Sequence, residues 1–273
     1  MKFDIVHFGE QYPDCSLSLF VHDEDSLPRP AVIVCPGGGY RFNSVREAEP
    51  IALFYYKAGM NAYLLRYSVE PYAKDYTPIK EVALSVKYVR ENAKAHNTAP
   101  DKIITCGFSA GGHLAASAGI LWNIPEIRDA VGVTGGSAPE GINRPNGMIL
   151  SYPVISAGVQ AHRGSINNLM GTSDYAIEDA DKFSLELHVN ETTPPMFIWH
   201  TVTDTCVPVQ NTTILINKYI EHSLSFEAHL YPRGHHGLSL ATAEVAEGNY
   251  AGIDPHVATW AELSVMWIKD MFN

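Results

Sequence analysis

The amino-acid sequence predicts an α/β protein built on a mostly parallel, twisted sheet with helices on both faces. Short apolar runs bounded by turn residues alternate with longer segments in which apolar residues recur every three or four positions. The chain has 273 residues, 46% hydrophobic and 18% charged, which is enough for one domain with a large core. We find no repeat, low-complexity tract or linker, and expect a single domain over residues 1–273.

Six apolar runs are the expected strands of the parallel sheet, because each is bounded by turn-forming residues. They cover residues 31–35, 62–67, 102–106, 148–152, 195–200 and 226–231. Ahead of them, residues 2–7 and 16–22 can form an antiparallel edge. Within the second segment Leu17, Leu19 and Val21 share one face, since side chains alternate along a strand.

Two helices are predicted in the first third of the chain. One is expected over 45–58, stopped by Gly59, with Pro50 as a point where it could break or begin later. Thr77 is a suitable N-cap for the other, with Pro78 at its first position. The apolar stripe of this second helix comprises Ile79, Val82, Val86, Val89 and Ala93.

Later segments add further helical patterns. One helix is expected to begin at Gly111, and the last covers 257–271. The side chains expected to face the sheet from the last helix are Ala258, Leu263, Met266 and Trp267. The stretch 153–194, with a helical pattern at 176–187, is far longer than the usual connection of about five residues. It is expected to be an insertion over the carboxyl edge of the sheet, either a lid or substrate wall or a plain surface excursion.

The charge of the chain limits its partners. A formal net charge of −11 leaves no basic stripe for phosphates, which argues against nucleic acids and anionic membranes. Asp4, His7 and Glu10 interrupt the start where a secretory signal needs an apolar run, and no stretch approaches ~18 consecutive apolar residues. We therefore expect a cytoplasmic protein, with the oligomeric state, including a homodimer, left open.

The four cysteines are far apart in the sequence and lack the paired spacing of a zinc site or a disulfide framework. Cys15, Cys35, Cys106 and Cys206 are therefore expected to be buried thiols, and no metal site is expected. Contact with substrate remains open for Cys35 and Cys206, because both adjoin the motifs described next.

The G-x-S-x-G motif at residues 107–111 lies between an expected strand and an expected helix. In that context Ser109 would occupy a sharp turn as a nucleophile, with glycines where neighbouring backbones leave no space for a Cβ. The alternative is a glycine-rich helix start that holds an anion. A serine nucleophile needs a base, so the partners of Ser109 decide between these interpretations.

An oxyanion site is suggested by Pro36 and the three glycines that follow the strand at 31–35. Backbone N–H groups in such a loop can bind developing negative charge together with the residue after the nucleophile. The candidate donors are Gly38, Gly39 and Ala110, and the alternative is a flexible turn.

The candidate acid and base also follow strands. Asp204 comes after the strand at 195–200, although an Asp in a polar turn is commonly only a turn residue. His235 and His236 come after the last strand, and at most one of them can be the base. The order serine, aspartate, histidine belongs to one hydrolase fold and differs from the orders in chymotrypsin and subtilisin.

Several side chains flank these motifs. Tyr40, Arg41 and His235 are the candidate substrate-binding residues, and Arg41 is favoured because it adjoins the glycine loop. His113, Trp199 and His200 also lie near the motifs, with core packing favoured for Trp199 and a backbone hydrogen bond as the alternative for His113.

Taken together, the segments VCPGGGY, PDKIITCGFSAGGHLAA, LHVNETTPPMFIWHT, DTCVPV and RGHHG resemble the esterase/lipase superfamily of α/β-hydrolases. The resemblance covers residues 30–236 and is close to the bacterial carbohydrate esterases described as acetyl xylan esterases or xylanase-associated lipase-like proteins. It implies Ser109 as nucleophile, Asp204 of D-x-x-V-P as acid and His236 of G-x-H-G as base. The hormone-sensitive-lipase branch has His where this chain has Pro36, so the chain departs from that branch.

The resemblance implies a cofactor-independent serine esterase that removes a short acyl group, mainly acetyl, from a carbohydrate or another small ester. Its expected partner is therefore a small-molecule ester such as an acetylated oligosaccharide. Two alternatives remain at this point. One is a peptidase-like hydrolase of the same fold, and the other is a non-catalytic binding protein that retained the fold.

Overall fold

The computed structural model describes residues 1–23 and 27–272, and within them the chain forms one eight-stranded sheet in the order β1-β2-β4-β3-β5-β6-β7-β8. Its strands are β1 (Lys2–His7), β2 (Ser16–Val21), β3 (Arg29–Cys35), β4 (Asn61–Arg66), β5 (Thr98–Phe108), β6 (Gly147–Ser151), β7 (Met196–Thr201) and β8 (Phe226–Tyr231). The pairs β1–β2 and β2–β4 are antiparallel, whereas the pairs from β4 through to β8 are parallel. The predicted α/β class, with a mostly parallel sheet and an antiparallel edge, is confirmed.

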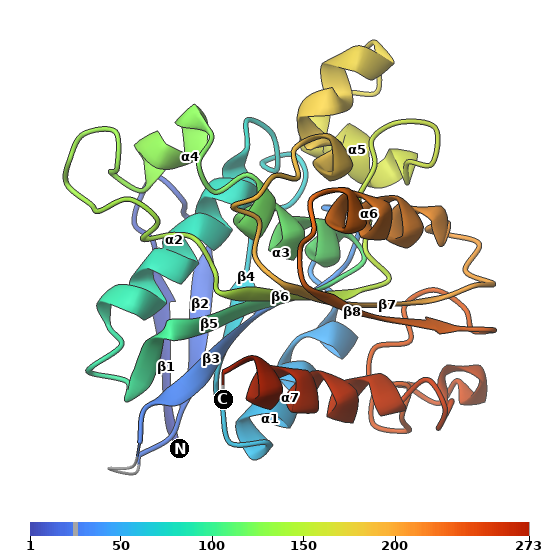
Figure 1. Cartoon of the computed structure of the whole chain (residues 1–273), viewed down its shortest axis with the longest axis horizontal. Coiled ribbons are helices and arrows are strands. Elements are labelled where there is room, and N and C mark those ends of the chain that lie inside the picture. Colours follow the sequence, from blue (N-terminus) through green and yellow to red (C-terminus); the bar gives the residue numbers. More distant parts are fainter. Residues whose placement is uncertain (24–26, 273) are drawn as a thin grey trace.

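Helices cover both faces of this sheet. They are α1 (Glu49–Lys57), α2 (Thr77–Glu91), α3 (Ala110–Ile120), α4 (Pro125–Ala130), α5 (Arg163–Met170), α6 (Gln210–Glu221) and α7 (Thr259–Met271). Figure 1 shows α1 and α7 below the sheet and α2, α3 and α6 above it. Short 3₁₀ helices lie at Val45–Glu47, Ile177–Phe183, Leu185–Leu187 and Tyr250–Gly252. Pro50 therefore marks the start of α1, after a separate 3₁₀ turn, rather than a break inside one helix.

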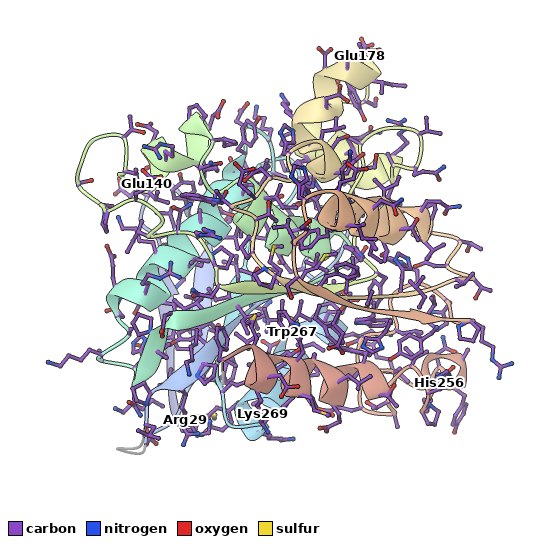
Figure 2. The ribbon with its side chains drawn as sticks, in the orientation of Figure 1. Arg29, Glu140, Glu178, His256, Trp267 and Lys269 are labelled. Atoms are coloured by element: carbon purple, nitrogen blue, oxygen red, sulfur yellow. The ribbon has the colours of Figure 1, made fainter. Side chains whose placement is uncertain are left out.

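The face that α7 turns to the sheet differs from the prediction. Met266 is 58% exposed, whereas Trp260, Val265 and Ile268 are buried. The prediction for Met266 was wrong because the buried stripe also includes small and polar positions such as Ser264, which shift its centre around the helix. Trp267 does lie between α7 and the sheet, as Figure 2 shows, 6.1 Å from the Phe197 ring.

Two clusters of buried side chains stabilise the two faces of the sheet. Above it, residues such as Leu65, Ile103 and Leu150 pack against α2 and α3. Below it, an aromatic cluster links the sheet to α1 and α7, with the rings of Trp199 and Trp260 stacked at 5.2 Å. The strand residues thus serve both clusters on alternate sides, which holds the carboxyl ends of β3, β5, β7 and β8 in a fixed arrangement.

The segment 153–194 contains α5 and two of the 3₁₀ helices. It leaves β6 at the carboxyl end and returns to the start of β7, and Figure 1 shows it on the same side of the sheet as α3 and α6. Glu178 lies at its tip, far from the sheet (Figure 2). Among the described residues, the helices are all too short or too polar to cross a bilayer.

Candidate active site

Ser109 occupies the sharp turn between β5 and α3 that the G-x-S-x-G motif predicts. Its backbone has φ 54° and ψ −119°, a conformation that is strained for a residue with a side chain. Gly107 and Gly111 allow this turn, because a Cβ on Gly107 would overlap the Gly111 carbonyl and one on Gly111 would overlap Cys35 and Pro36. Ser109 N–H donates to the Ser151 carbonyl at 3.0 Å, which ties the turn to the end of β6.

Ser109, His236 and Asp204 form one hydrogen-bonded chain. His236 Nε2 lies 2.8 Å from Ser109 Oγ, and His236 Nδ1 lies 2.6 Å from Asp204 Oδ2. A carboxylate only accepts, so Nδ1 carries the proton and Nε2 can accept the serine proton. These side chains come from the loops after β5, β7 and β8, whose parallel strands end at the same edge of the sheet.

The Asp204 carboxylate is fully buried and satisfied on both oxygens. Oδ1 accepts from the backbone N–H groups of Cys206 and Val207 at 2.8 and 3.0 Å, and Oδ2 also lies 3.3 Å from His200 Nε2. Burial alone would raise the pKa of Asp204, but the hydrogen bonds from His200 and His236, the His236 charge and the Val207 N–H hold that pKa well below its usual range. The carboxylate is therefore ionised wherever the protein is folded at ordinary pH.

The glycine loop after β3 lies beside Ser109. Gly38 has φ 127° and Gly39 has φ 67°, and a Cβ on Gly38 would overlap the Phe42 carbonyl. Within the described part of the chain, the N–H groups of Gly38 and Gly39 donate to no other group. They line the same cavity as Ser109 and are free to bind an oxygen there.

A buried carboxylate that the sequence analysis did not identify supports this loop. Glu47 Oε2 accepts from Gly37 N–H at 2.9 Å, and Glu47 Oε1 accepts from the Tyr152 hydroxyl at 2.6 Å. The Tyr152 oxygen in turn accepts from Ser239 N–H at 2.9 Å, and the Tyr152 ring packs edge-on against His236 at 5.0 Å. The Glu47–Tyr152 pair thus connects the glycine loop to the histidine loop.

Arg46 holds the histidine loop from the same 3₁₀ turn. Its guanidinium donates to the carbonyls of Gly237 and Val245 at 2.8 and 2.6 Å, and its own carbonyl accepts from Ser239 Oγ at 2.6 Å. Gly237 follows His236 directly, so this arginine fixes the backbone next to the imidazole.

The cavity above Ser109 measures about 750 Å³. One wall comes from the glycine loop and the 41–47 turn, and the other from the segment 153–194 through His162, Gly164 and Asn168. His162 Nδ1 accepts from Ser165 N–H and lies 2.8 Å from Ser165 Oγ, so its Nε2 carries the proton in the neutral form. Burial lowers the pKa of His162.

The three predicted substrate-binding residues occupy different places. Arg41 lines the cavity and is exposed. Tyr40 is fully buried, and its hydroxyl donates to His113 Nδ1 at 2.8 Å, so its side chain serves the interior rather than the cavity. His235 is exposed, and its Nδ1 lies 2.7 Å from the His236 carbonyl.

The remaining flanking residues are structural. His113 is buried, its Nε2 donates to the Phe183 carbonyl at 2.9 Å, and burial lowers its pKa to about 4. Trp199 is fully buried and donates to Ser151 Oγ. Cys15, Cys35 and Cys106 are buried as expected, whereas Cys206 is exposed and lines the cavity.

Sequence reasoning missed several cavity residues, among them Glu47, His162 and Asn168. None belongs to a short motif, and two of them lie in the insertion. Among the described residues, no cluster of His, Cys, Asp and Glu could hold a metal ion.

Comparison with known proteins identifies a family and several relatives of this chain. Residues 17–219 match the BD-FAE family. A curated relative named Endo-1,4-beta-xylanase B, from Butyrivibrio fibrisolvens, is 35% identical over 85% of this chain and 36% of its own length. An acetylxylan esterase from Xylanibacter ruminicola is 29% identical over 78% of this chain and 42% of its own. The chain thus spans about two fifths of the length of these relatives.

A solved structure agrees over nearly the whole chain. The acetyl ester-xyloside bifunctional hydrolase from Caldicellulosiruptor lactoaceticus superposes with a TM-score of 0.79 and 32% identity, covering 94% of this chain and 88% of the other.

Proposed function

Because the chain belongs to the BD-FAE family and has the α/β-hydrolase fold, we propose that it is a serine carboxylic-ester hydrolase that removes short acyl groups, mainly acetyl, from carbohydrates or similar small esters. The observation that carries the proposal is the hydrogen-bonded chain from Ser109 through His236 to Asp204 at the base of an open cavity. The names of the relatives, an acetylxylan esterase and an acetyl ester-xyloside hydrolase, support the acyl group and the sugar.

In the proposed acylation step, Ser109 Oγ attacks the ester carbonyl carbon while its proton passes to His236 Nε2. The carbonyl oxygen becomes an oxyanion, which the N–H groups of Gly38, Gly39 and Ala110 would bind. Asp204 stabilises the imidazolium that forms. When the tetrahedral intermediate collapses, His236 returns the proton to the departing alcohol oxygen, and the acyl group remains on Ser109.

Deacylation repeats these roles with water. His236 removes a proton from the water as it attacks the acyl carbon, and the proton then returns to Ser109 Oγ as the carboxylic acid leaves. This sequence needs no cofactor. The segment 153–194 acts in this proposal as the wall that faces the alcohol part of the substrate, within a single domain.

The test is a hydrolysis panel with the parent and Ser109→Ala. We expect the parent to hydrolyse aryl acetate and acetylated xylo-oligosaccharides faster than aryl octanoate, and an organophosphonate to label Ser109 alone. Ser109→Ala should fold normally and lose both activities. Turnover of aminoacyl anilides in preference to esters would favour a peptidase, and turnover of none of these compounds would favour a binding protein.

A further inference from the structure

A second cavity adjoins the one that holds Ser109. It measures about 320 Å³ and lies between the turn at Glu70 and Pro71 and the segment 167–173 at the end of α5. Glu70 and Asn168 line both cavities, so the two meet at these side chains. A molecule bound at Ser109 can therefore extend past them into the second cavity.

The polar atoms of this second cavity are held in fixed orientations. Asn168 Nδ2 donates to the Gly39 carbonyl at 2.9 Å, which leaves its Oδ1 as an acceptor. Asn167 Oδ1 accepts from the Tyr175 hydroxyl at 2.8 Å, which leaves its Nδ2 as a donor. Thr172 Oγ1 accepts from Asp174 N–H at 3.1 Å and retains its own proton for donation. The wall thus offers donors and acceptors side by side, without a cation.

Glu70 is the one charged group that both cavities share. Its backbone N–H donates to the Tyr40 carbonyl at 2.8 Å, which fixes the turn. Its carboxylate makes no hydrogen bond or ion pair with any other residue in 1–23 or 27–272, so both oxygens can accept from a ligand. A carboxylate can accept hydrogen bonds from the adjacent hydroxyl groups of a sugar, and it repels an anion. An acyl chain bound against it would remove its water at a cost in free energy.

We propose that the second cavity is a subsite for a neighbouring sugar residue, linked to the sugar whose acyl group is at Ser109. The inference rests on the proposed esterase function and deepens it by making an oligosaccharide the preferred substrate. Its volume is at the lower end of the ~300–1,000 Å³ typical of small-ligand pockets, which matches one sugar ring. Glu70, at the boundary, would accept hydroxyl groups from both rings.

The test compares kcat/KM for acetylated xylose with kcat/KM for acetylated xylobiose and xylotriose. We expect the parent to favour the disaccharide by about tenfold, since one or two hydrogen bonds of about 1 kcal/mol each are gained, and xylotriose to add little. Ser173→Trp, which fills the cavity from an exposed position, and Glu70→Gln, which removes the carboxylate, should each bring this ratio towards one.

Asp174→Asn is the matched control, because it removes a carboxylate from the same segment at a residue that does not line either cavity. It should keep the ratio of the parent. Equal kcat/KM for the mono- and disaccharide in the parent, or an unchanged ratio in Ser173→Trp and Glu70→Gln, would overturn the subsite. Hydrolysis of 4-nitrophenyl acetate separates the esterase function from the sugar subsite. If it occurs and depends on Ser109, the esterase function is upheld whatever the ratio of kcat/KM values. If it does not occur, the esterase function itself is contradicted.

Discussion

At the scale of single residues, the Asp204 carboxylate is held by contacts on both oxygens. Its Oδ1 accepts from two backbone N–H groups, and its Oδ2 lies close to the rings of His236 and His200. Asp204→Asn should lower kcat on aryl acetate by up to ~10⁴-fold, because an amide at this position favours the wrong imidazole tautomer. Steady-state kinetics with a matched measurement of the thermal midpoint would separate this effect from unfolding.

Asp174 and Asp181 provide the control for that substitution. Both are exposed residues of the insertion, so changing either to Asn should leave kcat within about twofold, as for most surface substitutions. A larger loss at either position than at Asp204 would show that the acid is misassigned.

The two adjacent histidines give a second test at this scale. His236→Ala should abolish acylation as completely as Ser109→Ala, and the double variant should be little worse than either, since triad members act as a unit. His235→Ala is the matched control, because its ring lies outside the hydrogen-bonded chain. Burst kinetics with an aryl ester would measure acylation directly, and activity that survives the His236 change but not the His235 change would reverse the assignment.

At the scale of elements, the 3₁₀ turn Val45–Glu47 connects the glycine loop to the histidine loop. Glu47→Gln replaces one of two acceptor oxygens by a donor, so the contact with Gly37 N–H or with the Tyr152 hydroxyl is lost. We expect kcat to fall at least tenfold with little change in KM. Complete loss of one oxyanion donor costs about 10²–10³ in kcat, and Glu47→Gln should cost less because it displaces the glycine loop without removing a donor.

Glu49→Gln is the control for this prediction. Glu49 lies two residues further on, and its contact is a half-exposed ion pair with Arg66 at 2.6 Å. Such pairs contribute about 0–1 kcal/mol, so the variant should keep the parent kcat and nearly the same thermal midpoint. An equal fall in kcat for both variants would indicate a general effect of α1 rather than the Glu47 contacts.

Helix α2 contains a buried carboxyl with a pH-dependent effect on stability. Burial raises the pKa of Glu81 to about 7 from 4.5, although Ser68 N–H and Oγ donate to it. Between pH 4.5 and about 7 the unfolded chain loses the Glu81 proton that the folded chain keeps. The resulting contribution to the free energy of unfolding is therefore fully present below pH 4.5 and is lost as the pH rises to about 7.

Glu81→Gln should remove that dependence. Relative to the parent, the variant should gain up to about 3 kcal/mol in unfolding free energy between pH 4.5 and 8, since each pKa unit corresponds to about 1.4 kcal/mol. Urea unfolding at several pH values would measure the difference. A constant difference across this range would mean that Glu81 titrates normally in the folded protein.

Sequence reasoning found the elements whose signals are local and missed elements whose buried side depends on tertiary contacts. Strand β8 and the start of α3 were predictable because apolar runs and glycines act locally. Helix α6 was not predicted, because two of its four buried residues, Asn211 and Thr212, are polar and shorten the apolar stripe. Those polar groups find protein partners only in the folded chain, where Asn211 Oδ1 accepts from the backbone N–H groups of Ile155 and Ser156.

At the scale of the whole molecule, the two clusters on either face share the strands of one sheet. We therefore expect a single cooperative unfolding transition. Tryptophan fluorescence, which reports mainly on Trp199, Trp260 and Trp267 in the lower cluster, should coincide with far-UV circular dichroism and with loss of activity. A separate, earlier loss of activity would mean that the 153–194 segment unfolds on its own.

The site as a whole was only partly predictable, because tertiary packing brings some of its residues into the cavity. Ser109, Asp204 and His236 follow strands in an order that the sequence displays, and the structure brings them within hydrogen-bonding distance. Glu47 and Glu70 enter the cavity only through the packing of a 3₁₀ turn and of a loop after β4, so no spacing along the chain identifies them. The proposed catalytic groups thus belong to local sequence motifs, whereas the walls of the cavity depend on tertiary contacts.

Cys206 is exposed and lines the same cavity as Ser109, two residues after Asp204, so its thiol could compete with Ser109 as a nucleophile. A thiolate there could take an acyl group from the substrate as a thioester and trap the protein in an unproductive form. Partial burial, reinforced by the negative charge of Asp204, raises the pKa of this thiol, so the thiolate is scarce at neutral pH. The carboxylate that we propose as the partner of His236 therefore also disfavours the thiolate form of Cys206.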